Sequence, residues 1–190
     1  MSATPFEPVE GPTRRPLTTD DVLAMVRAGT MAEDERVELI DGELFRMSPK
    51  NRRHELVQGW LIERATDMRA EAYKVAVEGT LYLSADTFVE PDIALIPRGT
   101  VITDLAGSDV FLIIEVSEAT RRYDLAVKRR KYAQGGVPEY WVIDVSRART
   151  VVHREPLGDD YANVVEFDDG QTLTPRLAPT FSVRIADAVA

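Results

Sequence analysis

The sequence contains no cysteine, which excludes a disulfide framework and any metal site built from thiolates. It also lacks an apolar run of membrane-spanning length, and its N-terminus lacks the hydrophobic segment of a signal peptide. We find no internal repeat, no glycine-rich phosphate loop and no serine-centred nucleophile elbow. These absences favour a cytoplasmic protein with no membrane contact, in which carboxylates, lysine and histidine are the side chains available for chemistry.

Length and composition predict one domain. With 190 residues, 44% of them hydrophobic, the chain is long enough to bury a sizeable core, which we place at 18–190. Residues 1–17 hold four prolines and no apolar periodicity, so they are expected to form a mobile arm or an arm against a partner. The net charge of −9 is unlike that of most nucleic-acid binders. Basic residues nevertheless cluster at 50–53, 121–122 and 128–131, either as a rim around one site or as separate solvated helix faces.

The order of the expected elements is that of an α/β fold. Apolar periodicity and turn residues predict helices at 18–29, 49–69 and 121–134, a tight hairpin at 36–47, and strands at 73–77, 80–84, 93–96, 110–116, 137–144, 151–154, 161–167 and 181–185. We expect a restriction endonuclease-like mixed β-sheet flanked by the second and third helices, with an antiparallel β extension at the C-terminus. The strands at 73–77 and 80–84 are assigned to this same sheet, and the loop 97–109 is expected to reach over the site.

Two of the buried strands carry a carboxylate that is unusual in an apolar strand. Asp92 stands at the start of one strand and Glu115 near the end of the next. A buried charge is costly unless it is paired, and a divalent metal ion would compensate both acids. The helix that follows supplies the opposite charge, because a period of 3.6 residues places Asp124, Lys128 and Tyr132 on one side. The alternative is a structural ion-pair network of Asp92, Glu115 and Lys128.

Three further residues have an ambiguous role. His54 begins the apolar stripe of the helix at 49–69, where it is either a hydrogen-bonded core residue or a contact to phosphate or a metal-bound water. Glu38, in the first strand of the hairpin, has the pattern of an exposed strand glutamate. His153 has no ligand partner at a suitable spacing, so we expect it at the surface or on an edge strand.

A spaced set of motifs resembles a known family. The set comprises Pro91-Asp92, Glu115-Val116-Ser117, Asp124, Lys128, Tyr132 and GVPEYWVID, and it extends back to His54 and to VELIDGEL at 37–44. It is similar to the Uma-two (DUF820) family of restriction-endonuclease-like proteins, which belongs to the PD-(D/E)xK nuclease superfamily, and it covers most of residues 18–185. The sequence departs from the superfamily pattern at Ser117, where a lysine would stand.

The resemblance implies a metal-dependent endonuclease that hydrolyses phosphodiester bonds in DNA. It implies Mg²⁺ or Mn²⁺ held by Asp92, Glu115 and the Val116 carbonyl, with the missing lysine replaced by Lys128. Lys128 would orient or deprotonate the attacking water, or stabilise the phosphate. The accessory residues are Glu38, His54, Ser117, Asp124, which we expect to pair with Lys128, and Tyr132; the residues expected to bind nucleic acid are Arg52, Arg53, Arg121 and Arg122. A homodimer is also expected.

Two other functional classes also use this fold or these residue types. A nuclease-fold module that binds nucleic acid or regulates, with little turnover, is favoured by the acidic net charge and by Ser117. A glycosidase would also use two carboxylates, but its chemistry needs no lysine on the adjoining helix. The sequence therefore favours a nuclease and leaves the binding module as the alternative.

Overall fold

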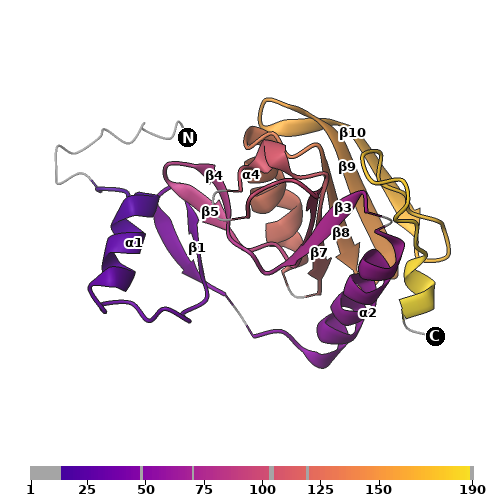
Figure 1. Cartoon of the computed structure of the whole chain (residues 1–190), viewed down its shortest axis with the longest axis horizontal. Coiled ribbons are helices and arrows are strands. Elements are labelled where there is room, and N and C mark those ends of the chain that lie inside the picture. The colour runs from indigo at the N-terminus through magenta and orange to yellow at the C-terminus, as the bar shows by residue number, and fades with distance from the viewer. Residues whose placement is uncertain (1–13, 48, 70, 103–104, 119, 189–190) are drawn as a thin grey trace, which may run out of the picture.

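Two β-sheets and the helices packed against them make up the fold (Figure 1). The computed structural model describes residues 14–47, 49–69, 71–102, 105–118 and 120–188. The larger sheet has the strand order β10-β9-β8-β7-β6-β3, and the smaller one has the order β2-β1-β5-β4. No helix in these described ranges is both long and apolar enough to cross a membrane.

The helices and strands occur in nearly the expected order along the chain. The strands are β1 Val37–Ile40, β2 Glu43–Arg46, β3 Tyr73–Val77, β4 Leu81–Ser84, β5 Thr87–Val89, β6 Ile93–Pro97, β7 Leu112–Ser117, β8 Glu139–Asp144, β9 Arg149–Leu157 and β10 Asp160–Asp168. The helices are α1 Thr19–Arg27, α2 Arg52–Met68, α3 Arg121–Tyr123 and α4 Arg129–Gln134, with a π-helical turn at Asp124–Lys128 and 3₁₀ turns at Gly107–Asp109 and Ile185–Ala188.

The larger sheet is mixed, as predicted. Its strands β7 and β8 pair in parallel, while the other neighbours in this sheet pair antiparallel. A parallel pair needs a crossover connection, and residues 121–134 supply it as one helical segment. The antiparallel hairpin of β9 and β10 then extends the sheet, which confirms the predicted α/β class and its C-terminal extension.

Different helices cover the two faces of the larger sheet, because successive strand residues point to opposite faces. Ile114 and Val116 of β7 pack in one cluster with Leu61 of α2. Ile113 packs on the other face with Tyr132 of α4. Figure 1 shows α4 between the two sheets and α2 on the far side of the larger sheet. Glu115 alternates with Ile114 and Val116, and it therefore faces α4.

The predicted tight turn at Asp41-Gly42 is confirmed. Both residues have positive φ, 50° and 76°, as a two-residue type I′ hairpin requires. Glycine is also needed for space, since a Cβ on Gly42 would lie 2.3 Å from Pro16 Cβ. Leu17 donates its N–H to the Gly42 carbonyl at 2.9 Å, so the end of the segment assigned as an arm lies against this turn. Residues 1–13 of that segment lie outside the described residues.

Two expectations about strand pairing are wrong. β4 does not continue the sheet of β3 but pairs with β5, an additional short strand, in the smaller sheet. The segment 181–185 forms no strand and makes a single bridge, from Val183 to Leu173. Its alternating pattern is real, because Phe181, Val183 and Ile185 are buried. Alternation reports which side chains are buried, and pairing requires a neighbouring strand as well.

The expected surface position of His153 is also wrong, because the residue is buried between β9 and the helical layer. Its Nδ1 lies 3.2 Å from the Tyr140 carbonyl oxygen, and its ring stacks on the Tyr140 ring with centroids 5.3 Å apart. Burial lowers the pKa of His153 to about 4. The imidazole is therefore neutral near pH 7 and acts as an aromatic core residue.

Candidate active site

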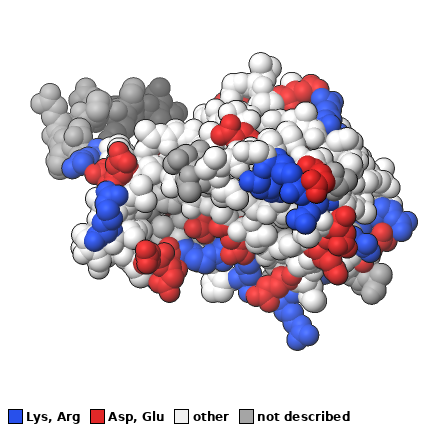
Figure 2. Space-filling view, in the orientation of Figure 1, with Lys and Arg blue, Asp and Glu red and all other residues white. Residues whose placement is uncertain are grey.

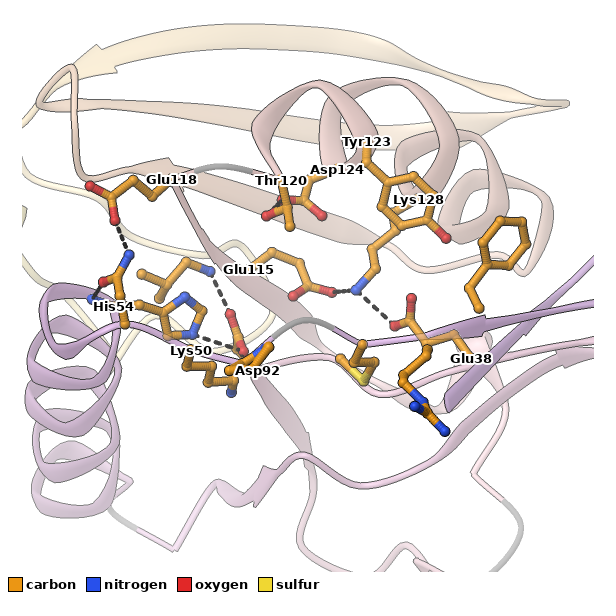
Figure 3. Close-up of a pocket in the computed structure, with 16 residues that line it drawn as sticks. Glu38, Lys50, His54, Asp92, Glu115, Glu118, Thr120, Tyr123, Asp124 and Lys128 are labelled. Atoms are coloured by element: carbon orange, nitrogen blue, oxygen red, sulfur yellow. Dashed lines mark hydrogen bonds and ion pairs between the residues drawn. The ribbon is translucent and has the colours of Figure 1, made fainter. Parts of the chain in front are cut away.

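A pocket of about 380 Å³ opens where the two sheets meet. The chain passes from β5 of the smaller sheet to β6 of the larger one through Asp92, which lines this pocket. The antiparallel register that aligns Ile93 with Ile114 places Asp92 across from Glu115. Lys128 enters from the helical layer and Glu38 from β1, so four separate segments converge on one cavity (Figure 3). The described residues of the loop 97–109 do not line the pocket, in contrast to the expectation that this loop reaches over the site.

Lys128 lies between two carboxylates. Its Nζ is 2.9 Å from Glu115 Oε1 and 2.8 Å from Glu38 Oε1 (Figure 3). Glu38 is only 3% exposed, so the expectation of an exposed strand glutamate is wrong, and its carboxylate is paired with the buried Lys128 ammonium. The Glu90 N–H also donates to Glu38 Oε1, at 3.2 Å. The predicted acid and lysine are thus brought together, and Glu38 joins them.

A π-helical turn presents Lys128 to the sheet. The N–H of Arg129 donates to the Asp124 carbonyl five residues earlier, and the Tyr140 hydroxyl donates to the same carbonyl at 3.3 Å. Single π-helical turns are rare and occur often at functional sites. Below this turn, Tyr132 donates its hydroxyl to Glu115 Oε1 at 2.7 Å. Lys128 and Tyr132 therefore contact the same carboxylate oxygen.

Asp92 is held by three donors. The backbone N–H of Val116 donates to Oδ2 at 2.8 Å, while Oδ1 lies 2.6 Å from Lys50 Nζ and 3.1 Å from His54 Nε2. His54 thus contacts a site carboxylate instead of filling the core. Lys50 was not predicted as a site residue, although it belongs to the basic cluster that precedes α2. Its position beside Asp92, 42 residues later in the sequence, carries no sequence signal of its own.

The charges of these groups are unevenly distributed. Burial raises the pKa of Glu115 to about 8, and the neighbouring acids Asp92, Asp124 and Glu38 add to the effect against Lys128. Burial disfavours the charge on Lys128, but Glu115 and Glu38 outweigh it and raise the pKa of Lys128 well above its ordinary value. Burial also opposes ionisation of Asp92, yet His54 and Lys50 lower its pKa. In the metal-free pocket the pKa of Asp92 is therefore lowered while that of Glu115 is raised, so Glu115 is the acid that retains its proton to higher pH.

The predicted ion pair between Asp124 and Lys128 is wrong. Lys128 turns to Glu115 and Glu38, and Asp124 Oδ2 accepts a hydrogen bond from Thr120 Oγ1 at 2.7 Å. Burial raises the pKa of Asp124, while Lys128, Thr120 and Ser117 oppose the rise. Ser117 is fully buried beside this acid. Asp124 thus lines the pocket near Lys128, and Ser117 is buried beside Asp124 without lining the pocket.

None of the four predicted nucleic-acid-binding arginines lines the pocket. Arg52 and Arg53 are exposed at the start of α2 and are absent from its described lining. Arg121 pairs through Nε with the buried carboxylate of Asp144 at 2.7 Å. Arg122 and Arg147 line a separate depression that borders the pocket at Glu118.

The basic cluster at 128–131 is largely neutralised by ion pairs with acidic side chains. Ion pairs join Arg129 to Asp160 at 3.3 Å, Arg130 to Asp159 at 3.7 Å and Lys131 to Asp41 at 2.6 Å. The face shown in Figure 2 likewise has acidic and basic side chains interspersed. Of the three clusters, only Lys50 and Lys128 point into the pocket, and both do so as partners of carboxylates.

The donor set suits a hard divalent cation. Within the described ranges no group of three or more His, Asp or Glu side chains is arranged to hold a metal. Asp92 and Glu115 nevertheless supply two carboxylates to one cavity, and Mg²⁺ commonly takes one or two carboxylates and fills its other positions with water and substrate oxygens. The N–H and C=O of one strand residue point to the same neighbouring strand, so the Val116 carbonyl is directed to the Asp92 side with its N–H.

Comparison with known proteins agrees with the geometry. A solved structure with a similar fold is the crystal structure of "a putative nuclease belonging to DUF820" from Anabaena variabilis ATCC 29413, with a TM-score of 0.70 and 17% identity over 91% of this chain and 97% of that chain. At this identity the likeness shows a shared fold. No curated protein matches the chain. The family model Uma2, described as "Putative restriction endonuclease", matches residues 20–186. The match spans most of the sequence, and the chain therefore belongs to the Uma2 family.

Proposed function

We propose that the protein is an endonuclease that hydrolyses phosphodiester bonds in DNA with the help of a divalent metal ion, Mg²⁺ or Mn²⁺. The observation that carries this proposal is the placement of Lys128 within 2.9 Å of Glu115 on a pocket that Asp92 also lines. Two carboxylates and a fixed ammonium on one cavity are what phosphodiester hydrolysis needs from the protein. Membership of the Uma2 family supports a nuclease independently of this geometry.

Asp92, Glu115 and the Val116 carbonyl would hold the ion. When bound there, a divalent ion supplies an activated water and neutralises charge on the phosphoryl oxygens. Val116 orients Asp92 through its N–H, and Tyr132 orients Glu115 through its hydroxyl. Both carboxylates are therefore fixed before a ligand arrives, as binding with little reorganisation requires.

Lys128 acts as a charge and not as a base. Its pKa is raised well above the ordinary value because Glu115 and Glu38 outweigh burial, so Nζ keeps its proton. A protonated Nζ donates to the attacking water and stabilises the negative charge that develops on the phosphate. Glu38 positions this ammonium from the opposite side, at 2.8 Å. Lys128 thereby fills the role of the lysine that Ser117 does not supply.

Cleavage of both strands of a duplex favours a homodimer, in which two sites face the two strands. Symmetric dimers are the commonest oligomers of soluble proteins. Light scattering at high protein concentration measures this directly. A monomer under these conditions would contradict the dimer and leave the chemistry of the site unaffected.

A nicking assay tests the proposed function. Supercoiled plasmid and single-stranded DNA are incubated with the wild type and Mg²⁺ or Mn²⁺, and the products are separated by electrophoresis. The wild type is expected to nick or cut only with metal, Glu115→Ala to be inactive, and Lys131→Ala, which alters the same helix outside the pocket lining, to match the wild type. Metal-dependent binding of DNA without any cut would favour the binding or regulatory module instead.

A further inference from the structure

Lys50 is a second lysine of the pocket, and the chemistry above does not use it. Its side chain is only 11% exposed, and its Nζ lies 2.6 Å from Asp92 Oδ1 (Figure 3). The same ammonium is paired with Glu78 Oε1 and donates to Gln58 Oε1 at 3.1 Å. Lys50 is thus shared between a carboxylate of the candidate metal site and a carboxylate outside the pocket lining.

The two lysines of the pocket are arranged alike. Lys128 joins Glu115 to Glu38, and Lys50 joins Asp92 to Glu78. The two lysines differ in the secondary structure of the backbone to which they belong. Lys128 belongs to a continuous helical segment, whereas Lys50 precedes the helix N-cap at Asn51 and lies in irregular backbone. A change of partner is therefore easier for Lys50, whose ammonium already contacts both acids.

Glu78 has side-chain partners other than Lys50. Arg36 Nη2 lies 3.1 Å from Glu78 Oε2, and Gln58 Nε2 donates to Glu78 Oε1 at 3.3 Å. Glu78 also has a positive φ of 51°, a conformation that a non-glycine residue keeps only where its surroundings fix it. The second acceptor for the Lys50 ammonium is therefore preformed.

We propose that Lys50 is a positioning residue that sets the metal affinity of the site. It neutralises Asp92 while no metal is bound, and it moves wholly onto Glu78 when a divalent cation takes Asp92. The inference rests on the proposed function, because it takes Asp92 as a metal ligand. An ammonium 2.6 Å from Asp92 Oδ1 repels an incoming dication, and Glu78 reduces the cost of moving it away.

Binding of Mn²⁺, measured by titration calorimetry and by thermal shift, tests this without any reference to activity. Lys50→Met is expected to bind Mn²⁺ about tenfold more tightly, because the ammonium that repels the dication beside Asp92 is removed. Glu78→Gln is expected to bind about tenfold more weakly, because Lys50 then has only Asp92 as its acid partner. In the double variant, Glu78→Gln is expected to add nothing to Lys50→Met. Lys131→Met controls for the loss of one positive charge.

Three outcomes would overturn the inference. In the first, Lys50→Met binds Mn²⁺ no more tightly than the wild type, while Asp92→Asn abolishes binding. This result would refute the role of Lys50 and leave the proposed nuclease intact. An equal effect of Glu78→Gln with and without Lys50 would show a simple charge effect. Absence of Mn²⁺ binding in both the wild type and Lys50→Met would refute this inference together with the metal site. Lys50→Gln, which keeps polar contacts without the charge, serves if Lys50→Met does not fold.

Discussion

Tyr132 donates its hydroxyl to Glu115 Oε1 at 2.7 Å, and both side chains are buried between the helical layer and the larger sheet. Burial raises the pKa of Tyr132 well above its ordinary value, and Glu115 adds to the rise. The hydroxyl therefore remains a donor throughout the working pH range. Its partner Glu115 is an acid that we propose as a metal ligand. A buried residue of the helical layer therefore fixes a residue of the candidate site.

Tyr132→Phe tests this relationship. The variant leaves Glu115 Oε1 with the Lys128 contact only, and loss of a buried hydrogen bond to a carboxyl group costs about 1–3 kcal/mol. Urea unfolding measures this loss, and Mn²⁺ titration is expected to show weaker binding. Tyr73→Phe is the matched control, because its buried hydroxyl donates to the Ala65 carbonyl at 3.0 Å, away from the pocket. Equal Mn²⁺ affinity in the two variants would contradict a positioning role for Tyr132.

Lys128→Met separates cleavage from metal binding. Nicking of plasmid is expected to fall by at least about 100-fold, because the fixed charge that stabilises the phosphate is lost. Stabilisation by Mn²⁺ is expected to persist, since Asp92 and Glu115 are intact, whereas Glu115→Ala loses both properties. Removal of one partner of a buried ion pair is also expected to destabilise the metal-free protein by about 3–5 kcal/mol. A folded Lys128→Met protein that cuts at the wild-type rate would refute the assignment.

The position of Ser117 allows a rescue of that variant. Ser117 follows Glu115 by two along β7 and faces the same side, beside Asp124. Ser117→Lys in the Lys128→Met background would restore an ammonium with Asp124 as its partner. Partial recovery of nicking is expected, measured against Ser117→Met in the same background. No recovery in a folded protein would show that the helix position of the lysine is required.

The raised pKa of Glu115 predicts how stability depends on pH. Its folded-state pKa is about 8 against an ordinary value of 4.5, so the folded protein binds more protons than the unfolded chain between these values. This contribution to stability is fully present below pH 4.5 and is lost as the pH rises to about 8. Thermal melts of the metal-free protein from pH 4.5 to 8.5 are compared with those of Glu115→Gln, which cannot ionise. The melting temperature of the variant is expected to rise relative to that of the wild type as the pH rises. Parallel curves of melting temperature against pH would contradict the prediction.

Local pattern was sufficient for much of the fold. Apolar runs with a carboxylate at one end located β6 and β7, and Gly135-Gly136 marked the end of the helical segment before β8. The π-helical turn at 124–128 was not predicted, because its hydrogen-bond register depends on a tertiary contact, the hydroxyl of Tyr140 on the Asp124 carbonyl. β5 was not predicted because it is only three residues long, too short to show an alternation of apolar and polar residues.

The site was predictable where chemistry and pattern agreed. Asp92 and Glu115 stood out because acids are rare in apolar strands, and both line the pocket. Glu38 has the alternation of an exposed strand, yet it is buried and paired with Lys128, which lies 90 residues later in the sequence. Lys50 contacts Glu78 and Asp92, which lie 28 and 42 residues later in the sequence, and no local sequence pattern predicts these contacts. Lys50 and Glu78 required the tertiary structure, whereas Glu38 was already expected as an accessory residue from the family resemblance.

The nucleic acid is expected to pass over the depression beside the pocket. Arg121, Arg122 and Arg147 line the depression that borders the pocket at Glu118. Arg121 is paired with Asp144 at 2.7 Å, and Arg147, which is more exposed, contacts the same carboxylate at 3.4 Å. Arg122→Ala combined with Arg147→Ala is expected to weaken DNA binding and to lower the slope of log affinity against log salt by about 0.9 for each lost phosphate contact.

Fluorescence anisotropy at several salt concentrations measures this effect, with Glu115→Ala in every protein so that the DNA stays uncut. Arg130→Ala is the matched control, since its side chain is 57% exposed, close to the 61% of Arg147, and it pairs with Asp159 away from the depression. Loss of one surface charge alone is expected to leave the slope of the control unchanged. An equal change in the control, or an unchanged slope in the double variant, would place the nucleic acid elsewhere.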